Sequence, residues 1–210
     1  MRRAIALVLV LSSLPAAELV VRDLRVGLDL LPLDFAYTLQ DSTGSRSGND
    51  VFARHVGLAI GGRYSLARIG DSHGTIVGLD LAASRAEYTP ASAVIGTYTL
   101  AGELGYGWAM TDEITVLGTG RIGLGAAHGT FNGSGSFASY APSGPLAEYG
   151  VRAGALWTVT DAIILDGTLG WRHAVTRMTA NGRDLDLDTG GLLVSLGMSW
   201  RFTSSPWRLE

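Results

Sequence analysis

Cysteine is absent from this 210-residue chain, and so is lysine. Without cysteine there is no disulfide framework, no cysteine-ligated metal and no thiol nucleophile. All 16 basic residues are arginine, the formal net charge is −3, and no basic stripe typical of nucleic-acid binders is visible. The four histidines are scattered without metal-ligand spacing. The sequence therefore predicts no nucleic-acid partner, no bound metal and no cofactor.

A long apolar run is also missing, except for a short one at the start. Two arginines precede the apolar stretch 4–11, and SSLPAA follows with small residues and a helix breaker. This order is typical of a secretory signal peptide at residues 1–17, cleaved near Ala16 or Ala17. The alternative, a membrane anchor, would need about 20 apolar residues. Because no later segment has a helix-length apolar run, we expect the mature chain to enter a membrane only as strands.

Charged residues are scarce, at 17%, whereas glycine is abundant, with 29 residues. Apolar and polar positions alternate with a period of two rather than 3.6, which is the pattern of a strand with two different faces. The stretch Tyr98–Met110 shows it most clearly, because Tyr, Leu, Trp and Met share one face while Thr, Ala and Glu share the other. No face of a helix would collect the first set.

Eight stretches share this alternation, and an even number of strands is the rule for single-chain outer-membrane barrels. The sequence predicts an all-β fold, an eight-stranded antiparallel up-and-down transmembrane β-barrel with a charged, glycine-rich lumen, over residues 18–202. Residues 203–210 would form a short C-terminal tail. Pro32 interrupts the phase of the first strand, which indicates a bulge there. The alternating stretches cover residues 24–30, 55–64, 77–82, 98–110, 116–124, 148–157, 165–172 and 192–202.

The expected connections alternate in length. Those centred on Asp112 and Asp161 are tight turns, and the one over residues 67–74 is somewhat longer. The remaining connections are long and polar. Short turns on one rim and long loops on the other are typical of the periplasmic and extracellular ends of membrane barrels, so we expect four mobile loops outside the cell. They cover residues 41–50, 88–97, 128–145 and 177–188.

A period of two does not say which face is inside. A soluble barrel encloses its apolar face, whereas a membrane barrel turns that face to lipid. Three features favour the membrane arrangement. Glycine shares the charged face and leaves room for long polar side chains in a narrow eight-stranded lumen, and the charges on that face can pair. Aromatic residues also gather near the tight turns as an interfacial girdle, formed by Tyr106, Trp108, Trp157 and Trp200.

The register of the expected hairpins places opposite charges at the same height in the lumen, where buried ions persist only when they are paired. The first tight turn puts Glu103 opposite Arg121, and the longer turn puts Arg63 opposite Asp80. If this lumen is dry, the substitution Glu103→Ala should leave the guanidinium of Arg121 without its partner.

The second tight turn extends the same pattern. It puts Arg172 opposite Gly150 and diagonal to Glu148 and Arg152. The expected lumen network consists of Arg63, Asp80, Glu103, Arg121, Glu148, Arg152, Asp166 and Arg172.

The last strand resembles the C-terminal assembly signal of outer-membrane proteins. A polar residue is followed by glycine two positions on, and two aromatic residues close the strand with one residue between them, at Ser195, Gly197, Trp200 and Phe202. The chain departs from that pattern by continuing eight residues to Glu210. The resemblance implies that the barrel-assembly machinery reads this strand.

Across residues 24–202 the eight-strand plan resembles the OmpA-type and opacity-type surface proteins. That resemblance implies a bacterial outer-membrane location with lipid and lipopolysaccharide as neighbours. Unlike in full OmpA-type proteins, we expect no peptidoglycan-binding domain after the barrel. A fold of this kind hosts several functions, so the resemblance says little about activity.

Three motifs favour other functions only weakly. Residues 118–123 satisfy G-x-G-x-x-G, but a dinucleotide site needs this motif between a strand and a helix, and here it lies inside a strand. Asp184, Asp186 and Asp188 alternate in the last long connection, without the glycine and ligand spacing of a calcium loop. We expect a solvated segment there.

Some outer-membrane barrels modify lipid A, and His173 is the best candidate for a catalytic base because its phase faces lipid near the outer rim. A hydrolase also needs a nucleophile and an orienting acid. No serine of matching phase lies on the neighbouring strands, although Ser134 or Ser136 could fold over from a loop. An interfacial histidine without catalysis is the simpler interpretation.

These observations predict a structural or surface-interaction barrel, not an enzyme, that displays its extracellular connections to an unidentified partner. The alternative is a small pore or transporter for ions or hydrophobic molecules. A lumen filled by Arg, Glu and Asp argues against conduction.

Overall fold

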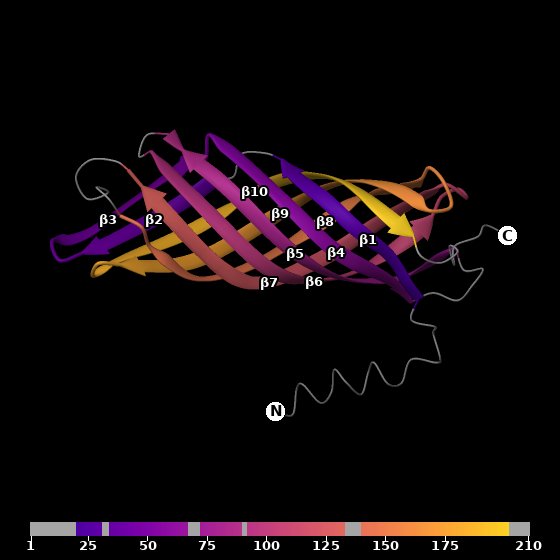
Figure 1. The fold of residues 1–210 in the computed structure, drawn as a ribbon, viewed down its shortest axis with the longest axis horizontal. Helices are drawn as coiled ribbons and strands as arrows, with labels where there is room; N and C mark the ends of the chain where they lie inside the picture. The colour runs from indigo at the N-terminus through magenta and orange to yellow at the C-terminus, as the bar shows by residue number, and fades with distance from the viewer. Residues whose placement is uncertain (1–19, 31–33, 67–71, 90–91, 133–139, 202–210) are drawn as a thin grey trace, which may run out of the picture.

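The structure is a computed structural model that describes residues 20–30, 34–66, 72–89, 92–132 and 140–201. The signal peptide expected at residues 1–17, the tail expected at 203–210 and Phe202 lie outside these ranges. Almost every described residue lies in a strand (Figure 1). The strands are Val20–Leu30 (β1), Asp34–Asp41 (β2), Gly44–Val51 (β3), Arg54–Leu66 (β4), His73–Tyr88 (β5), Ala93–Ala109 (β6), Ile114–Phe131 (β7), Ser143–Thr158 (β8), Ile163–Ala180 (β9) and Arg183–Arg201 (β10).

Eight of these strands close into a ring. β1 pairs with β4, each strand from β4 to β10 pairs with the next, and β10 pairs with β1, every pairing being antiparallel. The long tilted strands wind around one axis (Figure 1). The predicted eight-stranded up-and-down barrel is therefore confirmed. In the described part of the chain, no helix has the length and apolar character to cross a membrane.

The two extra strands are extensions of the ring. Leu30 faces Val194 and Asp34 faces Gly190 on β10, so β1 and β2 keep one register across the interval between them. The phase shift expected at Pro32 is thus wrong for the described residues on either side of it. The register irregularity that the structure shows in the first strand lies earlier, between Val21 and Asp23, where β1 pairs with β4. On the returning chain, Phe52 and His55 are both buried although an odd number of positions separates them, so the alternation changes phase between β3 and β4.

The prediction of long loops is wrong for most of these connections, because strands extend into them. Residues 41–50 form the β2–β3 hairpin with a two-residue turn, and the 88–97 connection shrinks to residues 89–92. Between β9 and β10 only Asn181 and Gly182 remain, both with positive φ (52° and 71°). Asn-Gly is the preferred pair for such a turn, because both residues tolerate this conformation. Of the 128–145 connection, the structure describes strand up to residue 131 and again from 143.

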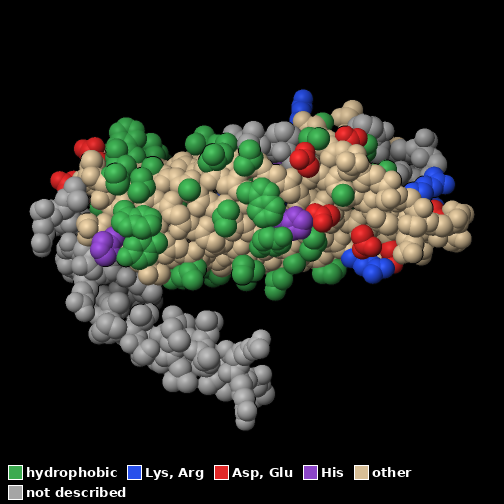
Figure 2. All heavy atoms as spheres, turned by 180° about the vertical axis from the view of Figure 1, so that it is seen from behind, with side chains coloured by type: hydrophobic (Ala, Val, Ile, Leu, Met, Phe, Trp, Pro, Cys, Tyr) green, Lys and Arg blue, Asp and Glu red, His purple; other side chains and the backbone are tan. Residues whose placement is uncertain are grey.

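The ring passes through two environments along its axis. Around one half, large apolar side chains point outward and are exposed, with aromatic residues at both margins of this belt. Figure 2 shows apolar side chains over that half of the visible face and carboxylates and arginines over the other. The belt includes Leu58, Ile60, Leu79, Leu81, Leu100, Leu104, Ile122, Leu124, Val151, Leu165, Leu169, Leu192 and Leu196.

The height of the belt matches a membrane. Tyr98 and Trp108 are exposed at its two margins on β6, ten residues apart. Ten residues rise about 33 Å along a strand, and a tilt of about 40° reduces this to about 25 Å along the axis. The apolar band of outer-membrane barrels is about 25 Å tall. The half with the hairpins β2–β3 and β9–β10 therefore stands outside the lipid.

The interior changes in step with the exterior. Behind the lipid belt the lumen is charged. In the half that leaves the membrane, the inward positions are apolar and the outward ones polar, as in a soluble protein. The charged-lumen expectation holds for the first half only. The outer apolar cluster contains Phe35, Leu39, Phe52, Ala86, Ala93, Ile95, Ala127, Phe131, Tyr140, Leu146, Met178, Leu185 and Leu187, and a smaller one near the tight turns contains Ile76, Leu117, Leu156 and Ile164.

Candidate functional site: a charged lumen layer and a groove on the outer wall

Arg121 is the centre of the charged layer. Its Nη1 donates to Asp80 Oδ2 at 2.9 Å, and its Nε donates to Glu148 Oε1 at 3.0 Å. All three side chains are buried. Arg172 on β9 lies 3.9 Å from Glu148 Oε2, diagonal to it as the register predicted. One guanidinium thus links β5, β7 and β8, and Glu148 extends the layer to β9. This arrangement matches the pairing that buried ions require.

A second ion pair crosses the lumen. Arg63 Nη2 on β4 lies 3.7 Å from Asp166 Oδ1 on β9. The expected placement of Arg63 opposite Asp80 is wrong, because Arg63 faces Gly78 and Asp80 faces Gly61. The turn between β4 and β5 is centred one residue earlier than expected, so the register slips by two. A slip of two keeps each side chain on its own face, and both residues still point inward.

The other predicted network residues also lie inside. Glu103 faces Arg121 in the β6–β7 register, as expected, and accepts a hydrogen bond from the hydroxyl of Thr119. Arg152 is buried as well. The sequence prediction omitted Asp29, whose Oδ1 accepts a 2.6 Å hydrogen bond from Ser195 Oγ. The alternation of the first strand had already shown that Asp29 opposes the apolar face.

His55 was another omission. Its ring is buried on β4 and no described residue forms a hydrogen bond with either nitrogen. It lines a small internal cavity of about 20 Å³ together with Arg172, at the border between the charged layer and the outer apolar cluster. A cavity of this size holds no ligand beyond about one water molecule.

Glycines supply the space that the charged side chains occupy. A Cβ at Gly61 would lie 1.9 Å from Asp80 Oδ1, and one at Gly123 would lie 2.8 Å from Glu148 Cγ. At Gly197 the nearest atom would be Asp166 Oδ2, at 2.5 Å. Each of these carboxylate side chains therefore lies over a glycine of the neighbouring strand, as a narrow lumen requires.

The expected girdle residues lie on the outer wall beside the tight turns. Trp108, Trp157 and Trp200 are 48%, 50% and 38% exposed, and Tyr106 packs against Trp108 with ring centroids 4.8 Å apart. A second girdle, which the sequence analysis missed, marks the other margin of the belt. Its members Tyr98, Tyr149 and Trp171 are also exposed and share the outward phase of their strands. Of the expected assembly signal, Ser195, Gly197 and Trp200 lie on β10, with Trp200 outward.

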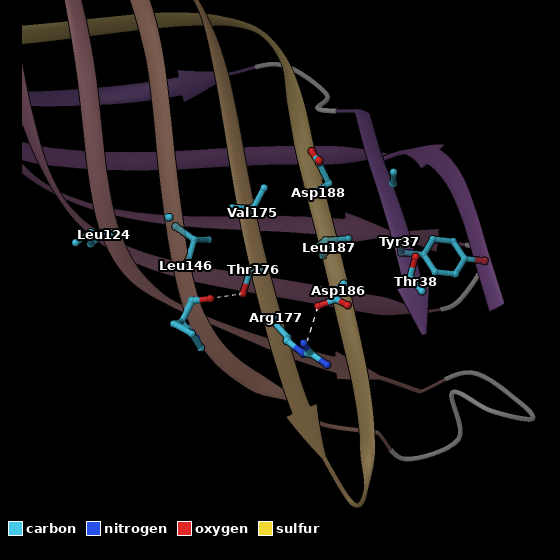
Figure 3. A pocket seen from close by; sticks show the side chains of 13 residues that line it. Tyr37, Thr38, Leu124, Leu146, Val175, Thr176, Arg177, Asp186, Leu187 and Asp188 are labelled. Carbon is cyan, nitrogen blue, oxygen red and sulfur yellow. Dashed lines mark hydrogen bonds and ion pairs between the residues drawn. The ribbon is translucent and has the colours of Figure 1, made fainter. Parts of the chain in front are cut away.

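A groove of about 540 Å³ crosses the outer wall where the belt ends (Figure 3). Its floor is a row of directly paired outward residues from β7 to β2, namely Leu124, Ala147, Val175, Asp188 and Ala36. The row begins with apolar residues of the belt and ends among polar ones.

The polar end of this groove carries both signs of charge. Arg177 Nη2 donates to Asp184 Oδ2 at 2.8 Å, and Arg177 Nε lies 3.6 Å from Asp186 Oδ1 (Figure 3). The side chains of Arg177 and Asp186 are more than half exposed. Polar groups that are both paired and exposed remain available to a ligand. The aspartates that the sequence placed in a solvated loop are instead strand residues.

His173 lies beside this groove. Its Nδ1 is 3.3 Å from Asp188 Oδ1, and its ring stacks on Trp171 at 5.7 Å and 12°. Trp171, His173 and Asp34 border a second hollow of about 650 Å³. No described hydrogen bond joins a serine to His173, so the described residues supply a base and an orienting acid without a nucleophile. In the described part of the chain, no cluster of His, Asp and Glu has a geometry that holds a metal.

The G-x-G-x-x-G motif lies inside β7. Gly118 points outward with no atom within 4 Å of an added Cβ, whereas Gly123 lies under Glu148. No helix follows the motif, so it has no dinucleotide-binding geometry.

Besides the pairing of β2 with β10, a side-chain contact ties the β2–β3 hairpin to the ring. The Tyr88 hydroxyl donates to Asp50 Oδ2 at 2.8 Å, and the Val51 N–H donates to Asp50 Oδ1 at 2.8 Å. These hydrogen bonds, chiefly the one from Tyr88, lower the pKa of Asp50 below its ordinary 3.8. A lowered folded pKa stabilises the hairpin above pH 3.8, and this contribution is lost as the pH falls through the lower folded value.

We therefore expect amide hydrogen exchange in β3 to speed up modestly below pH 3.8, relative to the exchange of β7. The variant Tyr88→Phe removes the main cause of the shift and should flatten this pH dependence. An acid response that is unchanged in Tyr88→Phe would show that another group controls the hairpin.

A closed ring of eight antiparallel strands with an apolar belt outside and paired ions inside is a transmembrane β-barrel of the outer-membrane type. The chain is therefore a bacterial outer-membrane protein.

The search of protein-family models and the search of curated proteins found no match to this chain. Among solved structures, it is similar to Neisserial surface protein A (NspA), with 17% identity, a TM-score of 0.46 and coverage of 85% of this chain and 97% of that chain. Ail, the attachment invasion locus protein of Yersinia pestis, is 14% identical with a TM-score of 0.40 and coverage of 86% and 99%. The outer membrane protease OmpT from Escherichia coli is 8% identical with a TM-score of 0.45 and coverage of 90% and 99%. At these identities the likenesses concern the fold alone.

Proposed function

We propose that the protein is a non-catalytic outer-membrane barrel that presents a rigid β-surface to the outside of the cell. The observation that carries this proposal is the reversal of polarity along the barrel. The outer half has an apolar interior, with Phe35, Phe131 and Tyr140 buried, and a polar exterior. Such a half is stable in water as a folded extension of the wall, and a rigid surface binds a partner at a lower entropic cost than mobile loops do.

The pore alternative is less well supported. Both ends of the charged layer meet an apolar cluster, and a cavity beside His55, at the border of one of these clusters, measures about 20 Å³. We expect no steady single-channel current from the purified protein in a planar bilayer, because an ion would have to pass desolvated between apolar side chains. Stable, unitary conductance steps from purified protein whose gel band shifts on boiling, as that of a folded barrel does, would overturn this expectation and favour the pore.

The enzyme alternative rests on His173 and Asp188, which lack a described nucleophile. We expect no acyl-chain release when the purified barrel is mixed with lipopolysaccharide. Release that disappears in His173→Ala would establish a lipid A-modifying enzyme instead.

The surface role is tested on whole cells. The β3 residues Ser45, Arg46 and Ser47 are exposed on the hairpin. Their joint replacement by alanine should reduce adhesion of expressing cells to surfaces at least several-fold. The barrel should still fold, which is checked on a gel where a folded barrel migrates as a compact band until the sample is boiled. The matched control replaces three exposed residues of the periplasmic turns, Asp112, Glu113 and Asp161. An equal loss in both variants, or none in either, would assign the protein a purely structural role in the envelope.

A further inference from the structure

The groove on the outer wall has a graded chemistry along its floor. One end is the apolar row Leu124, Ala147 and Val175, which continues the lipid belt. The small side chain of Ala147 hollows the wall between the larger ones. An acyl chain lying in the belt can extend into this end, where it buries apolar surface.

The other end binds a head that carries both charges. Arg177 donates one of its five N–H groups to Asp184, and its Nε lies 3.6 Å from Asp186 Oδ1. The remaining N–H groups can donate to an anion. Asp186 and Asp188 are 52% and 55% exposed, and they outnumber the guanidinium. A purely anionic head would be repelled by these carboxylates, and a purely cationic head would leave the remaining N–H groups of Arg177 without an anion.

The spacing fits a compact zwitterion. Arg177 faces Asp186 across the β9–β10 ladder, and Asp188 is the next outward residue on β10. Two residues along a strand span about 7 Å, so an anionic group at Arg177 and a cationic group at Asp188 would be close neighbours in one head. A carboxylate accepts N–H hydrogen bonds from a primary ammonium, whereas a trimethylammonium has none to donate.

We propose that this groove binds one membrane lipid with a phosphoethanolamine head. The acyl chain lies along Leu124, Ala147 and Val175, the phosphate meets Arg177, and the ammonium meets Asp186 and Asp188. The site is independent of the proposed surface role, because it lies on the wall at the membrane boundary and includes no residue of the hairpin tip.

The test uses the full barrel in uncharged detergent micelles, titrated with short-chain phosphatidylethanolamine and followed by native mass spectrometry and amide chemical shifts. We expect a single lipid to bind at least ten-fold more tightly than phosphatidylcholine or phosphatidylglycerol of equal chain length. Free O-phosphoethanolamine should bind far more weakly, because it lacks the chain. Equal binding of all three lipids, or of the free head group, would overturn the proposal.

Three variants locate the site. Ala147→Trp fills the groove and should abolish the preference, whereas Ala153→Trp places the same bulk outward on β8 away from the groove lining and should not. The double variant Asp186→Asn with Asp188→Asn should bind phosphatidylethanolamine no better than phosphatidylglycerol. If phosphatidylglycerol binds best to the wild-type chain, the head site is anionic-selective and the proposal fails. None of these variants should change cell adhesion, so a failure of the lipid proposal is distinguishable from a failure of the surface role.

Discussion

Replacing Arg121 with alanine should lower the free energy of unfolding by about 3–5 kcal/mol, because it leaves two buried carboxylates without their shared cation. Asp80 and Glu148 each lie about 3 Å from this guanidinium, and all three side chains are nearly inaccessible to water. The loss is large since an uncompensated buried charge costs more than the pair itself contributes. Urea-induced unfolding in lipid vesicles, followed by tryptophan fluorescence, measures it.

The matched control is Arg177→Ala. Arg177 also contacts two carboxylates, Asp184 and Asp186, but its side chain is 58% exposed. Exposed pairs contribute at most about 1 kcal/mol, because water and salt screen them. We therefore expect the two alanine variants to differ several-fold in their effect. Similar small losses in both would show that the lumen is hydrated around Arg121.

Arg121→Ala is a stronger test of the charged layer than Glu103→Ala, the substitution that the sequence suggests. The hairpin register correctly sets Glu103 opposite Arg121. Pairing of the backbone does not fix where a long side chain ends, however, and the guanidinium reaches Asp80, two strands away. Glu103→Ala would leave Arg121 with both of its described carboxylate partners, so it is the weaker probe.

The membrane half of the fold was predictable from the sequence because lipid enforces a strict contrast between the two faces of each strand. Around Glu103 and Arg121, the inward residues are polar or small and the outward ones are apolar or glycine, so period and register follow from the pattern. The residue types of the charged layer follow as well. The position of the turn after β4 does not, and the predicted Arg63–Asp80 pairing failed for that reason.

The half that stands outside the lipid was not predictable in the same way. The β3 residues 44–51 are exposed on both faces, so no alternation marks them as a strand. Phe35 and Leu39 have the phase of the charged face although they are apolar, because the barrel there meets water outside rather than lipid. The Asn181–Gly182 pair was the one local signal that could have revealed the β9–β10 hairpin. The groove combines residues of five strands and has no local signature.

Gly61→Ala should be the most informative single-methyl change, with an expected loss of about 1–3 kcal/mol or more. The added Cβ would lie 1.9 Å from Asp80 Oδ1 and 2.5 Å from the carbonyl oxygen of Leu79. The carboxylate of Asp80 would then have to leave Arg121, so the variant disturbs the ion pair without removing any charge. Urea unfolding in vesicles measures the loss, and the boiled and unboiled gel bands show whether the barrel still forms.

Gly118→Ala is the control, and its expected sign is opposite. Gly118 lies on the lipid-facing side of β7, and an added Cβ meets no atom within 4 Å. Alanine there restricts the unfolded chain and should stabilise the barrel by up to about 1 kcal/mol. If both alanines destabilise equally, glycine is needed for the curvature of the wall in general. If only Gly61→Ala destabilises the barrel, the inward glycines of the charged layer are needed to make room for its carboxylates. The abundance of glycine on that face then follows from the charges rather than from the barrel shape.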